Sequence, residues 1–420
     1  MRMSILSSNN GGLSSAGIGD GAWLVIVGIG EDGRAGLSVA AIRAIESCDV
    51  VFGGSRHLAL AGPLRGEAMA WPSPMTEAYR KILSLRGRRV GVLASGDPFQ
   101  YGVGAELARL VPPDEMVCFP HVSAFSLAAA RLGWSLPESA CVSLHGRALE
   151  RLIPHLQPGA RILALSWDGT TPGRVADLLN ERGFGGSDMI VLEAMGGPRE
   201  HVLRARAESF NLTGIDPLNV VALQVEAGPD ARIVSLAPGL DDTWFENDGQ
   251  LTKAEIRAVT LSALAPRAGC LLWDVGAGAG SIAIEWMLRH PANRAIAVEA
   301  SPERGERIAR NAARLGVPDL RVLVGEAPDA LAGLPVPDAV FIGGGATRAG
   351  LVEACFAVLR PGGRLVANAV TVETEERLSA SFARYGGAMR RIALSRLEPV
   401  GRLHGWRPAM PVTQWVVVKP

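Results

Sequence analysis

The stretch from Cys270 to Ala300 constrains the fold of this chain more than any other. Its first residues, Leu271–Val275, form a short apolar run that is typical of a buried parallel strand. Alternate glycines follow from Gly276 to Gly280, and then an apolar helix and a second strand that ends in Glu299. Glycines at a strand-to-helix turn let a ligand approach the backbone where a Cβ would clash. The order of these parts predicts a nucleotide-type ligand on an α/β sheet.

Two ligands compete for this turn, a dinucleotide and S-adenosylmethionine. The glycine spacing is G-x-G-x-G, whereas dinucleotide sites use G-x-G-x-x-G. Asp274 precedes the first glycine, where a carboxylate would repel a pyrophosphate but would suit the cationic amino group of an amino-acid ligand. We therefore expect S-adenosylmethionine, with Glu299 accepting hydrogen bonds from its ribose. A glycine turn without any ligand is the third alternative.

The composition favours a cytoplasmic chain of two or three domains without a nucleic-acid or membrane partner. Its 420 residues fit ~100–200 residues per domain, and its 42 basic and 42 acidic residues cancel without forming a basic block. Five scattered cysteines without a C-x-x-C pair predict a reducing compartment and no metal site. No apolar run approaches the ~20 residues that span a bilayer. Residues 1–22 are expected to be a flexible extension and not a signal peptide.

Strands alternate with helices along the chain, which predicts an α/β fold with parallel sheets. In residues 23–240 the expected strands are 23–27, 49–52, 89–94, 116–119, 162–166, 189–194 and 220–224, and the expected helices are 37–46, 75–85, 125–132 and 174–181, with another beginning near 103. A hinge near 134–140 would divide this part into two α/β subdomains. Residues 227–247, rich in glycine, proline and aspartate, are the expected linker.

The second domain, residues 248–420, is expected to begin with a helix that ends near Leu264. Thr252 is its predicted N-cap, and Glu255 would complete a capping box. Further strands are expected at 322–324, 339–342 and 364–367, and helices at 302–315 and 351–359. The alternating run 413–419 predicts a final, antiparallel strand. Trp273 and Trp286 are expected in the core.

Motifs at the ends of the predicted strands carry a family resemblance. They are Val27–Gly30, Val51–Gly53, Ala94–Pro98 and Pro120–Ala124 in the first part, and Leu251–Arg257, Asp274–Ser281 and Ile342–Gly345 in the second. Residues of about 23–240 resemble the tetrapyrrole (corrin and sirohaem) methylases. Residues of about 248–420 resemble the Rossmann-like methyltransferases that also decarboxylate precorrins. In this order the two resemble a fused enzyme of cobalamin (vitamin B12) biosynthesis. The chain departs from the pattern at His121, where many relatives have glycine, and at Phe99, where a small residue is often found.

The resemblance implies an S-adenosylmethionine-dependent C-methyltransferase with a precorrin substrate and one donor site in each lobe. The first lobe would methylate ring carbon 5, and the second would methylate carbon 15 and decarboxylate the ring C acetate. Such an in-line transfer depends mainly on alignment and exclusion of water, so no catalytic residue is singled out. The expected donor-site residues are Gly28, Gly30, Ser95, Gly96, Asp97, Ser123 and Ala124 in the first lobe, and Thr252, Asp274, Gly276, Ala277, Gly278, Ala279, Gly280, Glu299, Glu326 and Ala327 in the second.

Several alternatives stay open at this point. The acceptor is either metal-free or cobalt-bound, and the second lobe alone also resembles tRNA and protein methyltransferases, although the neutral charge counts against an RNA substrate. A non-catalytic donor sensor is the remaining class, and a homo-oligomer is expected. His145 either lines a site or is an ordinary hydrogen-bonded histidine. Five cations are candidates for substrate carboxylates or are solvated surface charges: Arg34, Arg56, Lys253, Arg257 and Arg348.

Overall fold

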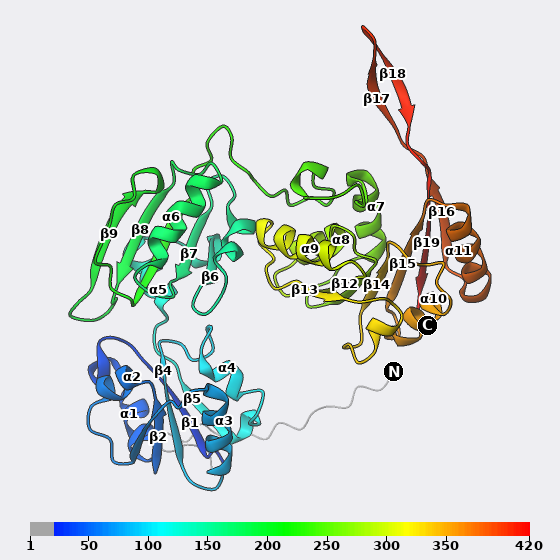
Figure 1. Cartoon of the computed structure of the whole chain (residues 1–420). Helices are drawn as coiled ribbons and strands as arrows, with labels where there is room; N and C mark the ends of the chain where they lie inside the picture. The colour runs from blue at the N-terminus through cyan, green and yellow to red at the C-terminus, as the bar shows by residue number, and fades with distance from the viewer. Residues whose placement is uncertain (1–20) are drawn as a thin grey trace, which may run out of the picture. The chain divides into compact units, whose positions relative to one another are not determined.

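The computed structural model describes residues 21–420, which divide into two compact units (Figure 1). The N-terminal unit holds residues 21–147 and 159–230, and the C-terminal unit holds residues 148–158 and 231–420. A segment of the first expected domain, with a 3-10 helix at Leu149–His155, therefore groups with the C-terminal unit. The expected flexible extension, residues 1–22, lies outside the described residues except for its last two. Within residues 21–420, no helix combines the length and apolarity that a membrane span requires.

The first sheet of the N-terminal unit is parallel throughout, in the order β3-β2-β4-β1-β5. Its strands are β1 (Leu24–Ile29), β2 (Val50–Gly53), β3 (Glu67–Ala70), β4 (Val90–Ser95) and β5 (Met116–Phe119). Its helices are α1 (Val39–Glu46), α2 (Ser55–Ala61), α3 (Met75–Ser84) and α4 (Val103–Leu107). All six residues of β1 are buried, because helices cover both faces of a parallel sheet and leave no polar side.

The second sheet of this unit is mixed, in the order β6-β7-β10-β8-β9, and only β6 and β7 run parallel. Its strands are β6 (Ser139–Ser143), β7 (Arg161–Leu165), β8 (Asp188–Glu193), β9 (His201–Arg206) and β10 (Asn219–Gln224), with α5 (Ala124–Leu132) and α6 (Thr171–Glu181). The sequence did not predict β3, β6, β9 or α2. Strands β3 and β9 are edge strands whose residues are mostly exposed, so they lack the apolar run that reveals an inner strand.

The C-terminal unit is built on a seven-stranded sheet in the order β13-β12-β11-β14-β15-β19-β16. Five strands run parallel: β11 (Leu271–Val275), β12 (Arg294–Glu299), β13 (Arg321–Val324), β14 (Ala339–Ile342) and β15 (Arg364–Ala369). The predicted last strand, β19 (Val412–Val418), is antiparallel to both β15 and β16 (Ala388–Ile392), as expected. The helices are α7 (Ala254–Leu264), α8 (Ser281–Leu288), α9 (Pro302–Arg314), α10 (Leu351–Val358) and α11 (Val372–Tyr385). Trp273 and Trp286 are buried, which confirms their expected place in the core.

The predicted capping box of α7 is wrong. The N-cap is Lys253, one residue later than Thr252, and no side chain caps the helix. The backbone carbonyl of Thr252 instead accepts a hydrogen bond from the side chain of Arg257, five residues later in the same helix. Thr252 therefore meets the helix through its backbone and not through its hydroxyl.

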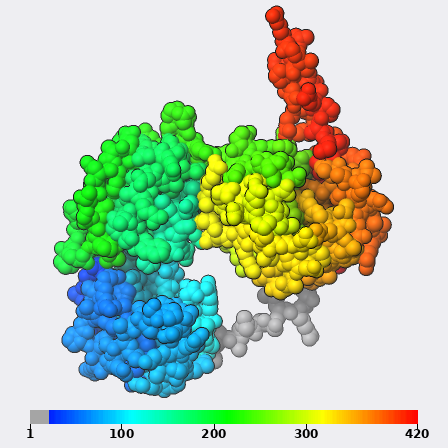
Figure 2. Space-filling view, viewed as in Figure 1, coloured from blue at the N-terminus to red at the C-terminus, as the bar shows by residue number. Residues whose placement is uncertain are grey.

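A two-stranded hairpin, β17 (Ser395–Val400) and β18 (Leu403–Pro408), pairs only with itself among the described strands. It stands out from the rest of the C-terminal unit as a thin arm (Figure 2). Its apolar side chains are largely exposed, with Leu403 at 75% and Trp406 at 72%.

Candidate active sites

The C-terminal unit contains a cavity of about 690 Å³ at the carboxyl ends of β11, β12 and β14. This volume and this place in a parallel sheet are typical of small-molecule sites. Seven of the ten predicted donor residues of this lobe line it: Thr252, Gly276, Ala277, Gly278, Glu299, Glu326 and Ala327. Asp274, Ala279 and Gly280 are not among the lining residues, and Asp274 is only 1% exposed.

The glycine turn after β11 has a left-handed backbone, with φ of +69° at Gly276, +60° at Gly278 and +76° at Gly280. A Cβ on Gly276 would lie 2.8 Å from the backbone of Gly344, and one on Gly280 would lie 2.6 Å from Ile308. Glycine is therefore required at these positions by the packing of the turn itself. Of these three glycines, Gly276 and Gly278 line the cavity.

Glu299, at the end of β12, is held at the edge of this cavity. Its Oε2 accepts a hydrogen bond from the Gly278 N–H at 2.8 Å, and its Oε1 accepts one from the Ser301 N–H at 3.1 Å. The side chain is nearly buried, so these two bonds fix its position. Each carboxylate oxygen keeps a lone pair that a ribose hydroxyl can use.

Asp274 lies behind the turn and is incompletely hydrogen-bonded. Its Oδ2 accepts from the Ala283 N–H at 3.0 Å, whereas its buried Oδ1 has no partner among the described residues. Burial raises the pKa of Asp274 to about 7, and the nearby Glu299 carboxylate adds to this shift. Two carboxyl groups beside one turn favour a cationic ligand group, which fits the ammonium and sulfonium of S-adenosylmethionine and not a pyrophosphate.

Arg257 is not a substrate ligand, which corrects one of the five expectations. Its guanidinium is fully buried and donates to Glu285 and to Asp242, each at 2.8 Å, and to the carbonyls of Leu240 and Thr252. Glu285 is a lone carboxylate on the otherwise apolar helix α8, and such a residue needs a buried cationic partner, which is the one signal of this pair in the sequence.

This buried pair holds residues 239–252, which we call the strap, beside the cavity. Glu285 accepts hydrogen bonds from the N–H groups of Gly239, at 2.6 Å, and Leu240, at 3.0 Å. At its other end, the strap contributes Gly249–Thr252 to the cavity wall. A Cβ on Gly278 would lie 2.7 Å from the Gln250 carbonyl, so the strap packs directly on the glycine turn.

Each lysine or arginine that lines the C-terminal cavity already has a carboxylate partner. The pairs are Lys253–Asp242 at 3.4 Å, Arg304–Asp248 at 2.8 Å, Arg348–Glu326 at 2.7 Å and Arg396–Glu255 at 2.6 Å. The carboxylate of Glu326, one of the expected donor-site residues, is therefore bound to Arg348. The guanidinium of Arg348 in turn holds the pKa of Glu326 below its usual value.

The N-terminal unit has its own cavity, of about 500 Å³, between its two sheets. One wall is formed at the carboxyl ends of β1 and β4, and the opposite wall includes Leu165 of β7, Leu192 of β8 and Val220 of β10. Six of the seven predicted donor residues line it: Gly30, Ser95, Gly96, Asp97, Ser123 and Ala124. Gly28 does not, and a Cβ there would lie 1.9 Å from the Gly96 carbonyl oxygen, so this glycine serves the close approach of two backbones.

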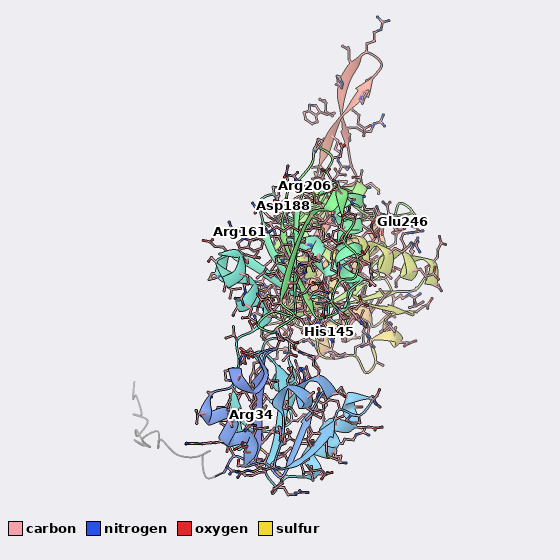
Figure 3. All side chains as sticks on the ribbon, turned by 90° about the vertical axis from the view of Figure 1, so that its left-hand side faces the viewer. Arg34, His145, Arg161, Asp188, Arg206 and Glu246 are labelled. Carbon is pink, nitrogen blue, oxygen red and sulfur yellow. The ribbon has the colours of Figure 1, made fainter. Side chains whose placement is uncertain are left out.

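His145 lines this cavity, and it lies at the end of the second sheet that faces the first (Figure 3). Of the two departures from the family pattern, His121 places its Nε2 3.3 Å from Asp32, and its ring lies over Gly30. Phe99 is 46% exposed and does not line the cavity.

Ser95 contacts two side chains, Arg56, which was among the expected cations, and His57, which the sequence did not single out. Its Oγ lies 2.7 Å from His57 Nε2 and 2.9 Å from Arg56 Nη2, and Arg56 also pairs with Glu31. Burial, with a smaller contribution from Arg56, lowers the pKa of His57 to about 4, so this imidazole is neutral at physiological pH. His57 was missed because it lies in α2, a short helix that the sequence did not predict.

Comparison with known proteins gives a family for each part of the chain. A model described as "Precorrin methyltransferase domain" matches residues 243–419, and one described as "Tetrapyrrole (Corrin/Porphyrin) Methylases" matches residues 23–211. A precorrin-6Y C(5,15)-methyltransferase (decarboxylating) of a Sinorhizobium species is 54% identical over 394 residues. The match covers 94% of this chain and 95% of that relative.

Two relatives from Salmonella typhimurium match single parts of the chain. A cobalt-precorrin-6B C(15)-methyltransferase (decarboxylating) is 35% identical over 166 residues, which cover 39% of this chain and 85% of the relative. A cobalt-precorrin-7 C(5)-methyltransferase is 32% identical over 189 residues, which cover 44% of this chain and 92% of the relative.

Proposed function

This chain belongs to the precorrin-6Y C(5,15)-methyltransferases (decarboxylating), and from that premise we propose that each of its two units binds S-adenosylmethionine and transfers one methyl group. Enzymes of this family use S-adenosylmethionine in cobalamin biosynthesis. The chain is accordingly a C-methyltransferase that adds methyl groups at ring carbons 5 and 15 of precorrin-6Y and removes the ring C acetate carboxylate, giving precorrin-8X.

One observation carries the proposal of two donor sites: each unit has its own cavity at the carboxyl ends of its parallel strands. Each is formed by residues of a single unit and includes a glycine-containing turn at its rim, at Gly276–Gly278 in one and at Gly96 in the other. A site complete within one unit needs no residue from the other.

The donor, when bound, supplies a methyl group already activated by its sulfonium. The residues of the chain then have to bind, orient and exclude water. In the C-terminal unit the carboxylate of Glu299 would hold the ribose, and the turn at Gly276–Gly278 would support the methionine part. In the N-terminal unit the loops at Ser95–Asp97 and Ser123–Ala124 would hold the donor against the first sheet.

We assign carbon 15 and the decarboxylation to the C-terminal unit and carbon 5 to the N-terminal unit. This division is supported by the two Salmonella relatives, which are named for one reaction each and match 39% and 44% of this chain. Loss of carbon dioxide belongs with carbon 15, because the ring C acetate must be oriented in the same cavity as the carbon that is methylated.

The test is mass spectrometry of metal-free precorrin-6Y after incubation with the full chain and labelled donor. We expect two labelled methyl groups and the loss of about 44 mass units, the mass of carbon dioxide. Gly278→Val should abolish the carbon-15 methyl and the carbon dioxide, because the new side chain strikes the Gln250 carbonyl and closes the turn.

Gly30→Val is the matched change in the other cavity. The atoms nearest to a Cβ there belong to the side chains of Asp32 and His121, which can move, so the fold should survive while carbon-5 methylation is lost. If either variant remains folded yet loses both methyl transfers, the two donor sites are not independent. If the wild-type chain transfers no methyl group to precorrin-6Y, the assignment of precorrin-6Y as its substrate is wrong.

A further inference from the structure

Arg147 differs from every other lysine or arginine that lines the two cavities. The four in the C-terminal cavity each have a carboxylate partner, and in the N-terminal cavity Arg56 is paired with Glu31. Arg147 lines the N-terminal cavity, and no carboxylate of the described residues lies within 4.0 Å of its guanidinium. It is thus an exposed cation with free hydrogen-bond donors at the wall of this cavity.

The guanidinium of Arg147 is not left to move freely, because it lies over the ring of Tyr101, 5.1 Å from the ring centre. The Tyr101 hydroxyl donates a hydrogen bond to the Cys141 carbonyl of β6 at 2.9 Å, and its ring packs beside Phe125 at 5.9 Å. Tyr101 therefore joins the loop after β4 to the second sheet. An aromatic face holds an arginine in place without neutralising its charge or using its N–H groups.

The backbone of Tyr101 is strained. Its φ of +58° lies in the left-handed region, which is rare for a bulky residue, and only two other non-glycine residues of the described chain share a positive φ. Such strain persists only where the surroundings enforce it and is concentrated at functional sites. Here it places the ring at the wall of the cavity and under Arg147.

We propose that Arg147, held on the ring of Tyr101, binds a carboxylate of the tetrapyrrole substrate in the N-terminal cavity. This inference rests on the proposed function, because it assumes an acceptor that carries carboxylate side chains. The planar guanidinium suits a bidentate bond to a carboxylate. The five cations that the sequence suggested are each occupied by a carboxylate of the protein itself.

The test is steady-state kinetics of carbon-5 methylation by the full chain, with the tetrapyrrole acceptor of this step and the donor varied in turn. For Arg147→Met we expect the KM for this acceptor to rise about tenfold to a hundredfold, the effect of losing a hydrogen-bonded charge pair. The kcat and the KM for S-adenosylmethionine should stay within about twofold, because the lost contact is the same in ground and transition states. The wild-type KM should rise with salt more steeply than that of the variant.

Two further variants distinguish the loss of carboxylate binding from a structural effect of the substitution. Arg147→Lys keeps the charge without the bidentate geometry, and it should recover part of the affinity. Arg161→Met is the matched control: Arg161 also lies over an aromatic ring, that of Trp134 at 5.4 Å, but at the opposite end of β7 from Leu165 and away from the cavity. In Figure 3 it lies farther from the first sheet than His145.

An unchanged KM for the tetrapyrrole acceptor in Arg147→Met would overturn the inference. A rise in the donor KM instead would assign Arg147 to the donor's own carboxylate and would also overturn it. An equal rise of the acceptor KM in Arg161→Met would show a structural effect of arginine–aromatic pairs and would overturn it as well. The proposed function is judged separately, by whether the wild-type chain methylates precorrin-6Y in the same assay.

Discussion

The buried pair of Arg257 and Glu285 should stabilise the C-terminal unit and hold the strap at the cavity. In Arg257→Met, the carboxylate of Glu285 would stay fully buried with only the N–H groups of Gly239 and Leu240 as partners. Removing one member of a buried ion pair typically costs about 3–5 kcal/mol of unfolding free energy. The strap would also lose the side chain that binds its Leu240 carbonyl, so donor affinity in the C-terminal cavity should fall.

The free energy of unfolding can be followed by urea denaturation. With a slope of about 2 kcal/mol per molar urea, the midpoint of the C-terminal unit should fall by roughly 2 M. Because the chain has two units, hydrogen exchange of peptides from α7 and α8 should assign this transition to the C-terminal unit. Donor binding is measured at a urea concentration where both proteins remain folded.

Two control variants test whether the loss of stability comes from an uncompensated buried charge. Arg396→Met removes a pair with Glu255 that is exposed to solvent, and it should cost less than about 1 kcal/mol. The double variant Arg257→Met with Glu285→Leu should recover part of the lost stability, since the uncompensated charge is then gone, although the N–H groups of Gly239 and Leu240 lose their acceptor. A single variant as stable as wild type, or a double variant as unstable as the single, would refute the reasoning.

Three further outcomes follow from the C-terminal unit. Glu299→Ala should weaken donor binding about tenfold to a hundredfold without unfolding the protein, as measured by calorimetry, because about 1.5–3 kcal/mol of charged hydrogen bonding is lost. Because the pKa of Asp274 is raised to about 7, its carboxyl group is neutral below that pH and negatively charged above it. The affinity for the cationic donor should therefore rise about tenfold from pH 6 to pH 8, and in Asp274→Asn this pH dependence should disappear. A fragment of residues 231–420 should fold and bind the donor. A fragment of residues 248–420 should be clearly less stable by urea denaturation, since it lacks the N–H groups that donate to Glu285. Equal stability of the two fragments would show that the strap does not stabilise the unit.

Much of the fold follows from local patterns. The central strands β1, β4, β11 and β14 are short apolar runs, because burial on both faces leaves no place for polar residues. The turn at Gly276–Gly280 could be recognised because left-handed backbone and close packing both demand glycine. Edge strands such as β9, with mostly exposed residues, carry no such signal.

The side-chain partners of the charged residues could not be predicted in the same way. Sequence patterns report burial and backbone conformation, which are set by near neighbours, whereas an ion pair depends on which distant segment arrives beside a charge. Arg257 and Glu285 are 28 residues apart, and Arg396 and Glu255 are 141 apart. The sequence alone determined the two α/β parts, the glycine turn and the acid at the end of β12. Only the tertiary structure decided that Arg257 belongs to the core, and that Arg147 keeps its charge free because an aromatic ring, and not a carboxylate, lies against it.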